Sequence, residues 1–468
     1  LFINVVRVRR ADKLNDITII FDVIFPMLDG DKVTFIGSTF IKYGEEEPYL
    51  NHCIALDTFD DVPGAESERY DTEKQVLLAW TKLIQRENPD IIIGYNIFGF
   101  DYRFMYERAC ENGYTCLQRF LKLSRNKDEV CGKEDKDGKI KIEETSLTIA
   151  SGTHNLNFIK MNGRIQIDLY NYFRREYNLT SYKLDYVSGH FIGDKIKKYD
   201  HFVANDGKVH TQIISKNLTG LKNDSYIHIE EIGHSSEFYE GGAKFHIYDV
   251  DEDAGTFSVS REIHPDTKKI LKWCLAKDDV SPHDIFRMTN EGPTERAVIA
   301  KYCIQDCNVV HHLLKKIDVI TGMVEMANIC SVPIDFIVMR GQGIKLFSFI
   351  AKKCREAKTL IPVLEKKDDG GYEGAIVLPP KCGLYLDEPV ACVDYSSLYP
   401  SSMISENLSH DSKVWALEYD LDGNLISEVG VKDASGNYIY DNLPEYEYVD
   451  VEYDTYEYLR KSEKSAAV

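Results

Sequence analysis

The chain has 468 residues, of which 43% are hydrophobic and 11% aromatic, and its 76 acidic and 56 basic residues give a net charge of −20 at pH 7. This length predicts about three structural units, and the apolar runs stay below the roughly 18 residues of a membrane-spanning helix, so we expect an intracellular protein without a membrane partner. The acidic balance excludes a uniformly basic nucleic-acid-binding surface, so any contact with DNA requires a local basic region or residues beyond this sequence.

The first predicted element is a β-hairpin. Residues 17–23 are rich in β-branched side chains, and Asp29-Gly30 separates them from a similar run at residues 32–40. Two such runs around an Asp-Gly turn are typical of antiparallel strands. Asp22 lies near the end of the first predicted strand.

Helix and strand patterns alternate in the next segment. Thr72 and Gln75 form the pattern of a capping box, which predicts a helix that ends before Pro89. The apolar residues expected on its buried face are Val76, Leu77, Trp80, Leu83 and Ile84. A buried strand is expected at residues 90–95, and Asp101 opens another helix, so this segment predicts an α/β layer.

Two stretches, residues 126–158 and residues 189–261, are polar and rich in turn residues. We expect them to form β-hairpins inserted into the α/β unit, with turns at Asp137-Gly138 and Asp206-Gly207. These insertions carry no predicted chemistry.

The remaining predicted elements are mainly helical. Residues 293–316 predict one long helix, residues 318–357 predict a second helical region, and a glycine-rich break follows at residues 370–375. The 11 cysteines are scattered without a Cys-x-x-Cys pair, which is typical of reduced core thiols and not of a zinc knuckle or a disulfide framework.

Three acidic residues occupy positions that suit a two-metal nuclease. Asp22 lies in the first strand, Asp101 follows the Tyr95–Phe100 loop, and Asp306 lies one helical turn after Tyr302. Positions i and i+4 share a helix face, so the hydroxyl of Tyr302 and the carboxylate of Asp306 are expected to point the same way. One group can then bind metal while the other orients the attacking water.

These residues also have a purely structural interpretation. An Asp at the end of a strand is often a helix N-cap or a turn residue. Tyr302 continues an apolar stripe typical of a buried helix face, and that stripe comprises Val298, Ile299, Val309 and Leu313. The occurrence of all three motifs in one chain favours the nuclease hypothesis.

A further motif follows residues 389–393, an apolar segment that predicts a strand. It presents one carboxylate, Asp394, at the start of a Tyr-Ser-Ser-Leu-Tyr-Pro turn. Such carboxylates bind the divalent ions that hold the reacting oxygens in phosphoryl transfer. A helical turn is expected after this motif, followed by polar hairpins.

Together the motifs resemble those of the family B DNA polymerases. Tyr95-Asn96-x-x-x-Phe100-Asp101 and Tyr302-x-x-x-Asp306 resemble two motifs of the family's 3′-5′ proofreading domain, and Asp394 to Ser401 resembles its first polymerase motif. Other similar stretches follow in family order, so the resemblance covers nearly the whole chain: Arg164-x-x-x-Asp168, Leu179 to Leu184, Arg340 to Lys345 and Tyr372-Glu373-Gly374-Ala375. The β insertion and Lys277 to Pro282 are most similar to polymerases of large nucleocytoplasmic DNA viruses.

The resemblance implies an α/β fold: an RNase H-like 3′-5′ exonuclease domain with β-hairpin insertions, followed by the start of a polymerase palm. Residues 1–16 would be a remnant of an N-terminal domain, and residues 17–316 the exonuclease domain, with its β-rich insertion at about 189–261. Residues 317–384 would form a helical connection with a template-binding Tyr-x-Gly motif, and residues 385–468 the beginning of the palm.

The resemblance also implies roles for individual residues. Asp22, Asp101 and Asp306 would bind Mg²⁺ at the exonuclease site, beside Tyr302, and Asp394 would bind two Mg²⁺ ions at the polymerase site. The residues implied in binding the deoxynucleoside triphosphate are Tyr395, Ser396, Ser397, Leu398 and Tyr399. The residues implied in binding DNA are Tyr372 and Gly374 at the template, and Asn96 and Phe100 at the 3′ end of the primer. An ordinary glycine-rich linker is the alternative for Tyr372 and Gly374.

One departure concerns the first exonuclease motif, which in the family is Asp-x-Glu. Alternation in a strand places positions i and i+2 on one face, so two carboxylates can share the metals there, but Ile24 occupies the second position here. Either a segment that contained the Glu has been lost, or the site is degenerate. We therefore expect weak or absent exonuclease activity.

A second departure concerns the end of the sequence. The family's fingers lysine and Asp-Thr-Asp palm turn do not occur before Val468, so we expect the front part of a longer polymerase that does not polymerise alone. A stand-alone 3′-5′ exonuclease and a DNA-binding scaffold with a decayed nuclease site remain alternatives. The expected partners are primer–template DNA, deoxynucleoside triphosphates and a sliding clamp or other processivity factor, in the host nucleus or at a cytoplasmic viral replication site.

Overall fold

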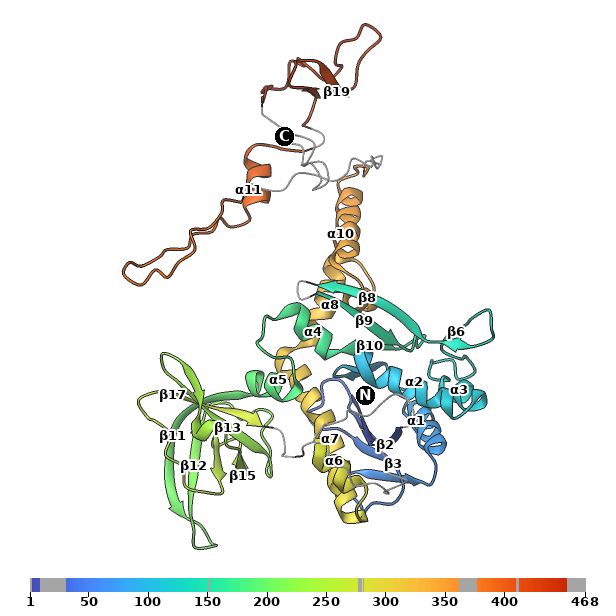
Figure 1. Cartoon of the computed structure of the whole chain (residues 1–468), viewed down its shortest axis with the longest axis vertical. Helices are drawn as coiled ribbons and strands as arrows, with labels where there is room; N and C mark the ends of the chain where they lie inside the picture. Colours follow the sequence, from blue (N-terminus) through green and yellow to red (C-terminus); the bar gives the residue numbers. More distant parts are fainter. Residues whose placement is uncertain are drawn as a thin grey trace, which may run out of the picture. The chain divides into compact units, whose positions relative to one another are not determined.

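The computed structural model describes residues 2–8, 31–149, 152–276, 280, 282–361, 377–409 and 412–452. The chain divides into two compact units, residues 1–361 and residues 362–468. The first unit combines a helix-covered mixed sheet with a second sheet built almost entirely from β-hairpins (Figure 1).

The mixed sheet has six strands in the order β10-β5-β1-β2-β3-β4. Its strands are β1 (Phe2–Val8), β2 (Lys32–Phe40), β3 (Leu50–Leu56), β4 (Glu66–Tyr70), β5 (Ile91–Gly94) and β10 (Ile165–Asp168). β1 is antiparallel to β2 and parallel to β5, and β5 is parallel to β10. An antiparallel hairpin joined to parallel strands that follow helices is the arrangement expected of an RNase H-like α/β domain.

The expected hairpin between residues 17–23 and 32–40 differs from the structure. β2 pairs with β1 on one side, with Phe2 opposite Thr39, and with β3 on the other, with Phe35 opposite Ala55. Both edges of β2 are therefore occupied, and residues 17–23 lie outside the described residues. A local β pattern predicts that a segment forms a strand, but several apolar segments compete for the same neighbour. The segment expected to be a remnant of an upstream domain thus supplies β1.

Alternation along β3 explains why helices cover both faces of this sheet. Ile54 belongs to the apolar cluster that contains Trp80 of α1 (Glu73–Glu87), whereas Cys53 and Ala55 belong to the cluster that contains Ile299. The predicted capping box of α1 is present, and all five apolar residues predicted on its inner face are buried.

The long helix α7 (Pro293–Ile317) lies on the opposite face and approaches the sheet closely at Gly37. A Cβ atom added to Gly37 would lie 3.0 Å from the backbone carbonyl carbon and oxygen of Cys303. Only glycine leaves this helix at its observed distance from β2, and Asp306 lies one turn beyond the contact.

Replacing Gly37 with Ala is expected to lower the free energy of unfolding by about 1–3 kcal/mol, because the backbone of α7 must move away from the sheet. Gly322→Ala is the matched control, since this helical glycine has nothing within 4 Å of the added Cβ and should gain up to about 1 kcal/mol. Urea unfolding monitored by circular dichroism measures both. Equal stability of the two variants would contradict the close approach.

Short helices and hairpins follow β5. They are the π-helical turn η1 (Ile97–Asp101), α2 (Tyr102–Glu111), α3 (Tyr114–Phe120), β6 (Lys133–Glu134), β7 (Ile140–Lys141), β8 (Glu143–Ile149) and β9 (Gly152–Phe158). The pairs β6–β7 and β8–β9 are antiparallel, which confirms the hairpins predicted in residues 126–158 and the turn at Asp137-Gly138. After β10 come α4 (Leu169–Glu176) and α5 (Leu184–Phe191).

The second sheet contains the predicted hairpin around Asp206-Gly207 but extends beyond the expected range, to Ala276. Its elements are β11 (Gly193–Val203), β12 (Val209–Ser215), β13 (Tyr226–Ile232), β14 (Ser236–Phe238), the 3₁₀ turn η2 (Tyr239–Gly241), β15 (Phe245–Asp251), β16 (Thr256–Val259) and β17 (Ile270–Ala276). The strand β17 pairs with both β11 and β13, so the sheet closes on itself around an apolar interior.

Five helices complete the first unit: α6 (Pro282–Thr289), α7, α8 (Val319–Cys330), α9 (Ile334–Met339) and α10 (Gln342–Glu356). The predicted helical region at residues 318–357 is thus divided in three. Ser331 ends α8 with a φ of 54°, Pro333 follows it, and Gly341 precedes α10. No helix in the described ranges is long and apolar enough to cross a membrane. All eleven cysteines fall within the described residues and are free thiols, as expected.

The described part of the second unit contains α11 (Leu398–Ser405), β18 (Trp415–Tyr419) and β19 (Leu425–Gly430). The helix confirms the helical turn expected after Asp394, and β18–β19 is one of the expected hairpins. The strand predicted at residues 389–393 is not formed: Val390 and Val393 are 71% and 86% exposed. A strand requires a hydrogen-bonded neighbour, and the sheet of this unit in the described residues is the β18–β19 pair alone.

Candidate active site

The loop that carries Asn96, Phe100 and Asp101 leaves the end of β5 in a tight turn. Asn96 has a φ of 66°, a left-handed conformation that non-glycine residues seldom adopt, and η1 follows directly. A Cβ atom on Gly99 would lie 2.2 Å from the side-chain oxygen of Asn96, so any other residue at position 99 would displace this side chain. Asp101 ends η1 and precedes α2, which confirms that it opens a helix. Its side chain is buried, with 6% of the residue exposed.

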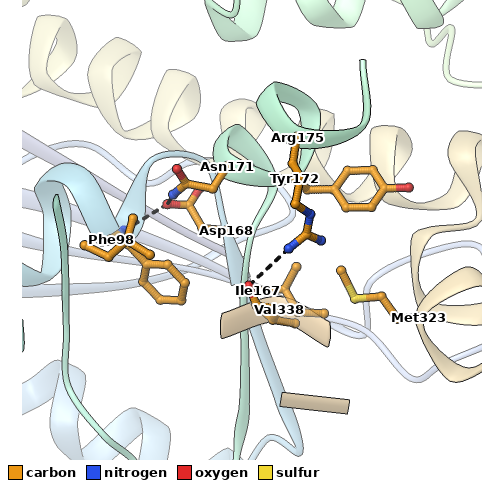
Figure 2. Close-up of a pocket in the computed structure, with 9 residues that line it drawn as sticks. Phe98, Ile167, Asp168, Asn171, Tyr172, Arg175, Met323 and Val338 are labelled. Atoms are coloured by element: carbon orange, nitrogen blue, oxygen red, sulfur yellow. Dashed lines mark hydrogen bonds between the residues drawn. The ribbon is translucent and has the colours of Figure 1, made fainter. Parts of the chain in front are cut away.

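Asp168 holds this loop from the end of β10. Its carboxylate accepts hydrogen bonds from the backbone N–H groups of Asn96 (2.8 Å) and Phe98 (3.0 Å), and from the N–H of Tyr170 (3.0 Å) and the side-chain amide of Asn171 (2.9 Å) in α4. Figure 2 shows the Asp168 carboxylate directed at Phe98 and Asn171. The same residue therefore caps α4 and fixes the loop that presents Asp101.

The pKa of Asp168 is raised to about 6, because burial penalises the charged carboxylate more than its four donors stabilise it. The folded state therefore binds this proton more tightly than the unfolded state, in which the pKa is near 3.8. Between these two pH values the unfolded state ionises first, so stability falls as pH rises, and the change is complete above pH 6.

The stability advantage of the unmodified chain over Asp168→Asn is accordingly expected to shrink by about 2 kcal/mol between pH 4 and pH 7, since each pKa unit corresponds to about 1.4 kcal/mol and the unfolded carboxyl is already partly ionised at pH 4. Urea unfolding of both proteins across this range measures the difference. The account of Asp168 fails if the difference is constant or grows with pH.

The segment from Leu179 to Leu184 supports the same loop. The hydroxyl of Tyr95 donates a 2.6 Å hydrogen bond to the backbone oxygen of Tyr182, and the hydroxyl of Tyr182 donates to the backbone oxygen of Tyr177 at 2.8 Å. These contacts give the stretch a structural role.

A small pocket lies beside Asp168, between α4 and residues of α8 and α9. Figure 2 shows Phe98, Ile167 and Met323 around it, with Arg175 donating to the backbone oxygen of Val338 at 3.3 Å. Among the described residues, its lining contains none of the predicted site residues. We therefore regard it as packing space behind the loop.

Tyr302 and Asp306 lie on one side of α7, and burial increases along this side from Val298 to Asp306. Val298 is 45% exposed, Tyr302 is partly buried and Asp306 is 7% exposed. The core face of the helix consists instead of Ile299, Cys303 and Cys307. The apolar stripe that would make Tyr302 an ordinary core residue is thus broken by the exposed Val298.

The buried Arg296 fixes the start of α7. Its guanidinium donates to the backbone oxygens of Thr58 (2.7 Å) and Thr289 (2.6 Å), and also to that of Leu56. It therefore links the helix that carries Asp306 to the loop after β3.

The charges of Asp101 and Asp306 both affect the thiol of Cys307. Burial raises the pKa of the Cys307 thiol well above its usual value, and the charges of Asp306 and Asp101 raise it further. Asp101 and Asp306 are separated by more than 200 residues of sequence, yet both carboxylates act on this one group. That Asp101 and Asp306 share one metal site stays a prediction.

The structure describes some of the remaining predicted exonuclease residues but not all of them. Asp22 and Ile24 lie outside the described residues. Asn96 and Phe100 are partly buried, and the ring of Phe100 is stacked on Phe104 with a centroid distance of 5.7 Å. One face of Phe100 is thus engaged within the protein.

Asp394 and its neighbours form an exposed turn in the second unit. Tyr395 and Tyr399 are 76% and 61% exposed, and Ser397, with a φ of 51°, directly precedes α11. The side-chain oxygen of Ser401 donates to the backbone oxygen of Ser396 at 3.2 Å and braces the turn. Tyr372 and Gly374 lie outside the described residues.

Two positioning residues, Asp168 and Arg296, have roles that the sequence did not predict. An Asp at a strand–helix junction could have indicated the cap on α4. Nothing local could have indicated the bonds to Asn96 and Phe98, which lie about 70 residues earlier. An Arg in the first turn of an amphipathic helix is normally solvated, so its burial was not foreseeable.

Comparison with known families matches two regions of the chain. Residues 16–187 match the model described as DNA polymerase family B, exonuclease domain, and residues 332–461 match DNA polymerase family B. The first range contains Asp22 and Asp101 and the second contains Asp394, whereas Asp306 lies between them.

Curated relatives extend the match to nearly the whole chain. The DNA polymerase of Phaeocystis pouchetii virus is 50% identical over 486 residues, which covers 99% of this chain and 46% of that protein. The DNA polymerase of Pyramimonas orientalis virus is 38% identical, with 95% of this chain and 32% of the relative covered. The DNA polymerase delta catalytic subunit of Candida albicans is 27% identical over 83% of this chain and 28% of its own length.

The chain spans less than half the length of these relatives. Its alignment with the Phaeocystis pouchetii virus protein is longer than the chain itself, so that protein contains residues that this chain lacks. The chain belongs to the family B DNA polymerases and carries their exonuclease domain followed by the start of their polymerase domain.

Proposed function

We propose that this chain is the front part of a DNA-directed DNA polymerase and that its first unit forms a 3′-5′ editing site around Asp101 and Asp306. The observation that supports the proposal is that both carboxylates are buried and that the charges of both raise the pKa of the Cys307 thiol. Asp22 would complete the acidic set from the first predicted strand, and Tyr302 would orient water from its position one turn before Asp306.

The donor set suits Mg²⁺. Carboxylate oxygens are the ligands that this hard cation prefers, and Asp101, Asp306 and Asp22 supply them at the editing site as Asp394 does in the polymerase motif. Bound ions would supply charge stabilisation of the phosphate oxygens and an activated water or hydroxyl. The contribution of this chain is to hold the carboxylates in place, through Asp168 for the loop of Asp101 and Arg296 for the helix of Asp306.

Asn96 and Phe100 are proposed to bind the 3′ end of the DNA. The left-handed turn at Asn96 is supported by two hydrogen bonds from the loop to Asp168, which pre-organises the loop before DNA arrives. Phe100 already stacks on Phe104, so an unpaired base would extend an existing aromatic pair.

The second unit is proposed to supply the first part of the nucleotide site. The turn from Tyr395 to Leu398 and the first turn of α11 would provide backbone N–H groups that bind the triphosphate. Tyr399 would pack beneath the deoxyribose. Tyr372 and Gly374 are proposed to contact the template. The partners would be primer–template DNA, deoxynucleoside triphosphates and a processivity factor, at an intracellular site of viral replication.

A DNA-binding measurement tests the editing site. Fluorescence anisotropy of a labelled single strand whose 3′-terminal linkage resists cleavage is expected to show at least about tenfold tighter binding with Mg²⁺ than with a chelator. The double variant Asp101→Asn/Asp306→Asn should lose this difference, whereas Asp200→Asn, on the exposed edge of the insertion, should keep it. Binding of equal strength with and without Mg²⁺ would favour the scaffold alternative.

A further inference from the structure

The β-rich insertion carries a cluster of two histidines and one glutamate at one end of its sheet. His201 lies near the end of β11, and Glu262 and His264 lie in the segment between β16 and β17. One potential ligand atom from each of the three residues lies within 4.8 Å of the others. The cluster belongs to neither the proposed editing site nor the nucleotide motif.

The segment that carries Glu262 and His264 is fixed by hydrogen bonds around the buried Ile263, which is 1% exposed. The hydroxyl of Thr211 donates to the backbone oxygen of Arg261 at 3.0 Å and accepts from the N–H of Ile263 at 3.2 Å. Further along, the N–H of His264 donates to the hydroxyl of Tyr239 at 3.0 Å. Residues on either side of an inward-facing Ile263 project to the opposite side, so Glu262 and His264 share one outward face.

The two side chains on this face already meet: the Nε2 atom of His264 lies 3.2 Å from a carboxylate oxygen of Glu262. His201 approaches from β11, with its ring centroid 4.8 Å from that of His264. All three side chains are exposed, so small rotations are enough to bring their ligand atoms around one ion.

A backbone hydrogen bond orients His201 in the way that metal-binding histidines are usually oriented. Its Nε2 atom lies 2.9 Å from the backbone oxygen of Ile263 and donates to it, which leaves the lone pair of the neutral ring on Nδ1. The nearest cation of the same segment, Arg261, is engaged elsewhere, because its guanidinium donates to Glu240 at 2.7 Å and lies over the ring of Phe245.

We propose that His201, Glu262 and His264 form a binding site for a divalent transition-metal ion of the Zn²⁺ class. Two imidazoles and one carboxylate are a ligand set that Zn²⁺ accepts with open positions for water, whereas Mg²⁺ and Ca²⁺ prefer oxygen ligands alone. A bound ion would link the segment after β16 to the end of β11, because it shares ligands from both. The proposed site therefore differs from the editing site in its position and in the metal that it prefers.

Zn²⁺ titration of the metal-free full chain by calorimetry tests this proposal. The background should be Cys382→Ser/Cys392→Ser, because these two thiols are exposed and a thiolate is itself a Zn²⁺ ligand. We expect this protein to bind one more equivalent of Zn²⁺ than its His264→Asn and Glu262→Gln derivatives, or to bind it at least tenfold more tightly. Millimolar Mg²⁺ should not displace the ion.

His246→Asn is the matched control, because His246 also pairs with a carboxylate, that of Asp224, at 3.2 Å in the same sheet but has no third ligand within the described residues. This variant should retain the full stoichiometry. Circular dichroism of each protein in chelator excludes misfolding as the cause of a loss. Equal stoichiometry and affinity for the unmodified cluster and the His264→Asn protein, with both folded, would overturn the proposal.

Discussion

Ile24→Glu is expected to make the chain remove mismatched 3′ nucleotides from primer–template DNA at least about tenfold faster in the presence of Mg²⁺, which corresponds to about 1.4 kcal/mol of transition-state stabilisation. Residues 22 and 24 fall on one face of the predicted strand, so a glutamate at residue 24 adds a carboxylate beside Asp22. A further ligand strengthens the hold on the metal ions that stabilise the developing charge.

The matched variant Ile24→Gln has nearly the same shape as the glutamate but lacks its charge. It should leave the slow cleavage rate of the unmodified chain unchanged. Adding Asp306→Asn to Ile24→Glu should abolish the gain, because the new carboxylate acts only together with those of Asp306 on α7 and Asp101 at the end of η1. Equal acceleration by Gln and Glu would show that residue 24 does not contribute a metal ligand.

Asp394→Asn is expected to reduce primer extension by roughly a thousandfold or more in a polymerase completed with the part of the Phaeocystis pouchetii virus protein that this chain does not match, equivalent to about 4 kcal/mol. Loss of the carboxylate removes a ligand of the ions that hold the triphosphate and the primer hydroxyl. Gel analysis of single-nucleotide extension measures the rate.

Asp387→Asn provides the control for this experiment, because Asp387 lies a few residues before the motif and is exposed. It should extend primers at the rate of the unsubstituted chimera. The same chimera with Asp394→Asn should still bind primer–template DNA, which separates loss of chemistry from loss of folding. Extension by the Asp394→Asn chimera at the control rate would remove Asp394 from the polymerase site.

The local elements of the fold were predictable because they depend on short patterns. The capping box at Thr72, the inner face of α1 and the turn at Asp206-Gly207 follow from side-chain chemistry within a few residues. Strand pairing was less predictable, since the choice of β1 as the neighbour of β2 depends on competition between segments. The length of the insertion was underestimated for a similar reason: β17 pairs with strands more than 35 residues away.

The candidate site was also predictable only in part. Asp101 and Asp306 could be selected because each sits in a distinctive motif, and both are buried in the structure. The supports of these residues were not foreseeable, because Asp168 and Arg296 act through bonds to backbone groups that no side-chain pattern records. The segment before Asp394 shows a further limit: it was predicted to be a strand but is exposed and forms none, since an apolar sequence specifies a strand only where a partner strand is present.

Backbone cleavage by bound Fe²⁺ tests the central claim most directly, because iron in place of Mg²⁺ generates hydroxyl radicals that cut the chain next to the ion. With ascorbate and peroxide, we predict cuts near residues 22, 101 and 306 together, suppressed by excess Mg²⁺ and lost in Asp101→Asn/Asp306→Asn. Cuts near only one of these segments, or a pattern unchanged in the double variant, would contradict a shared metal site.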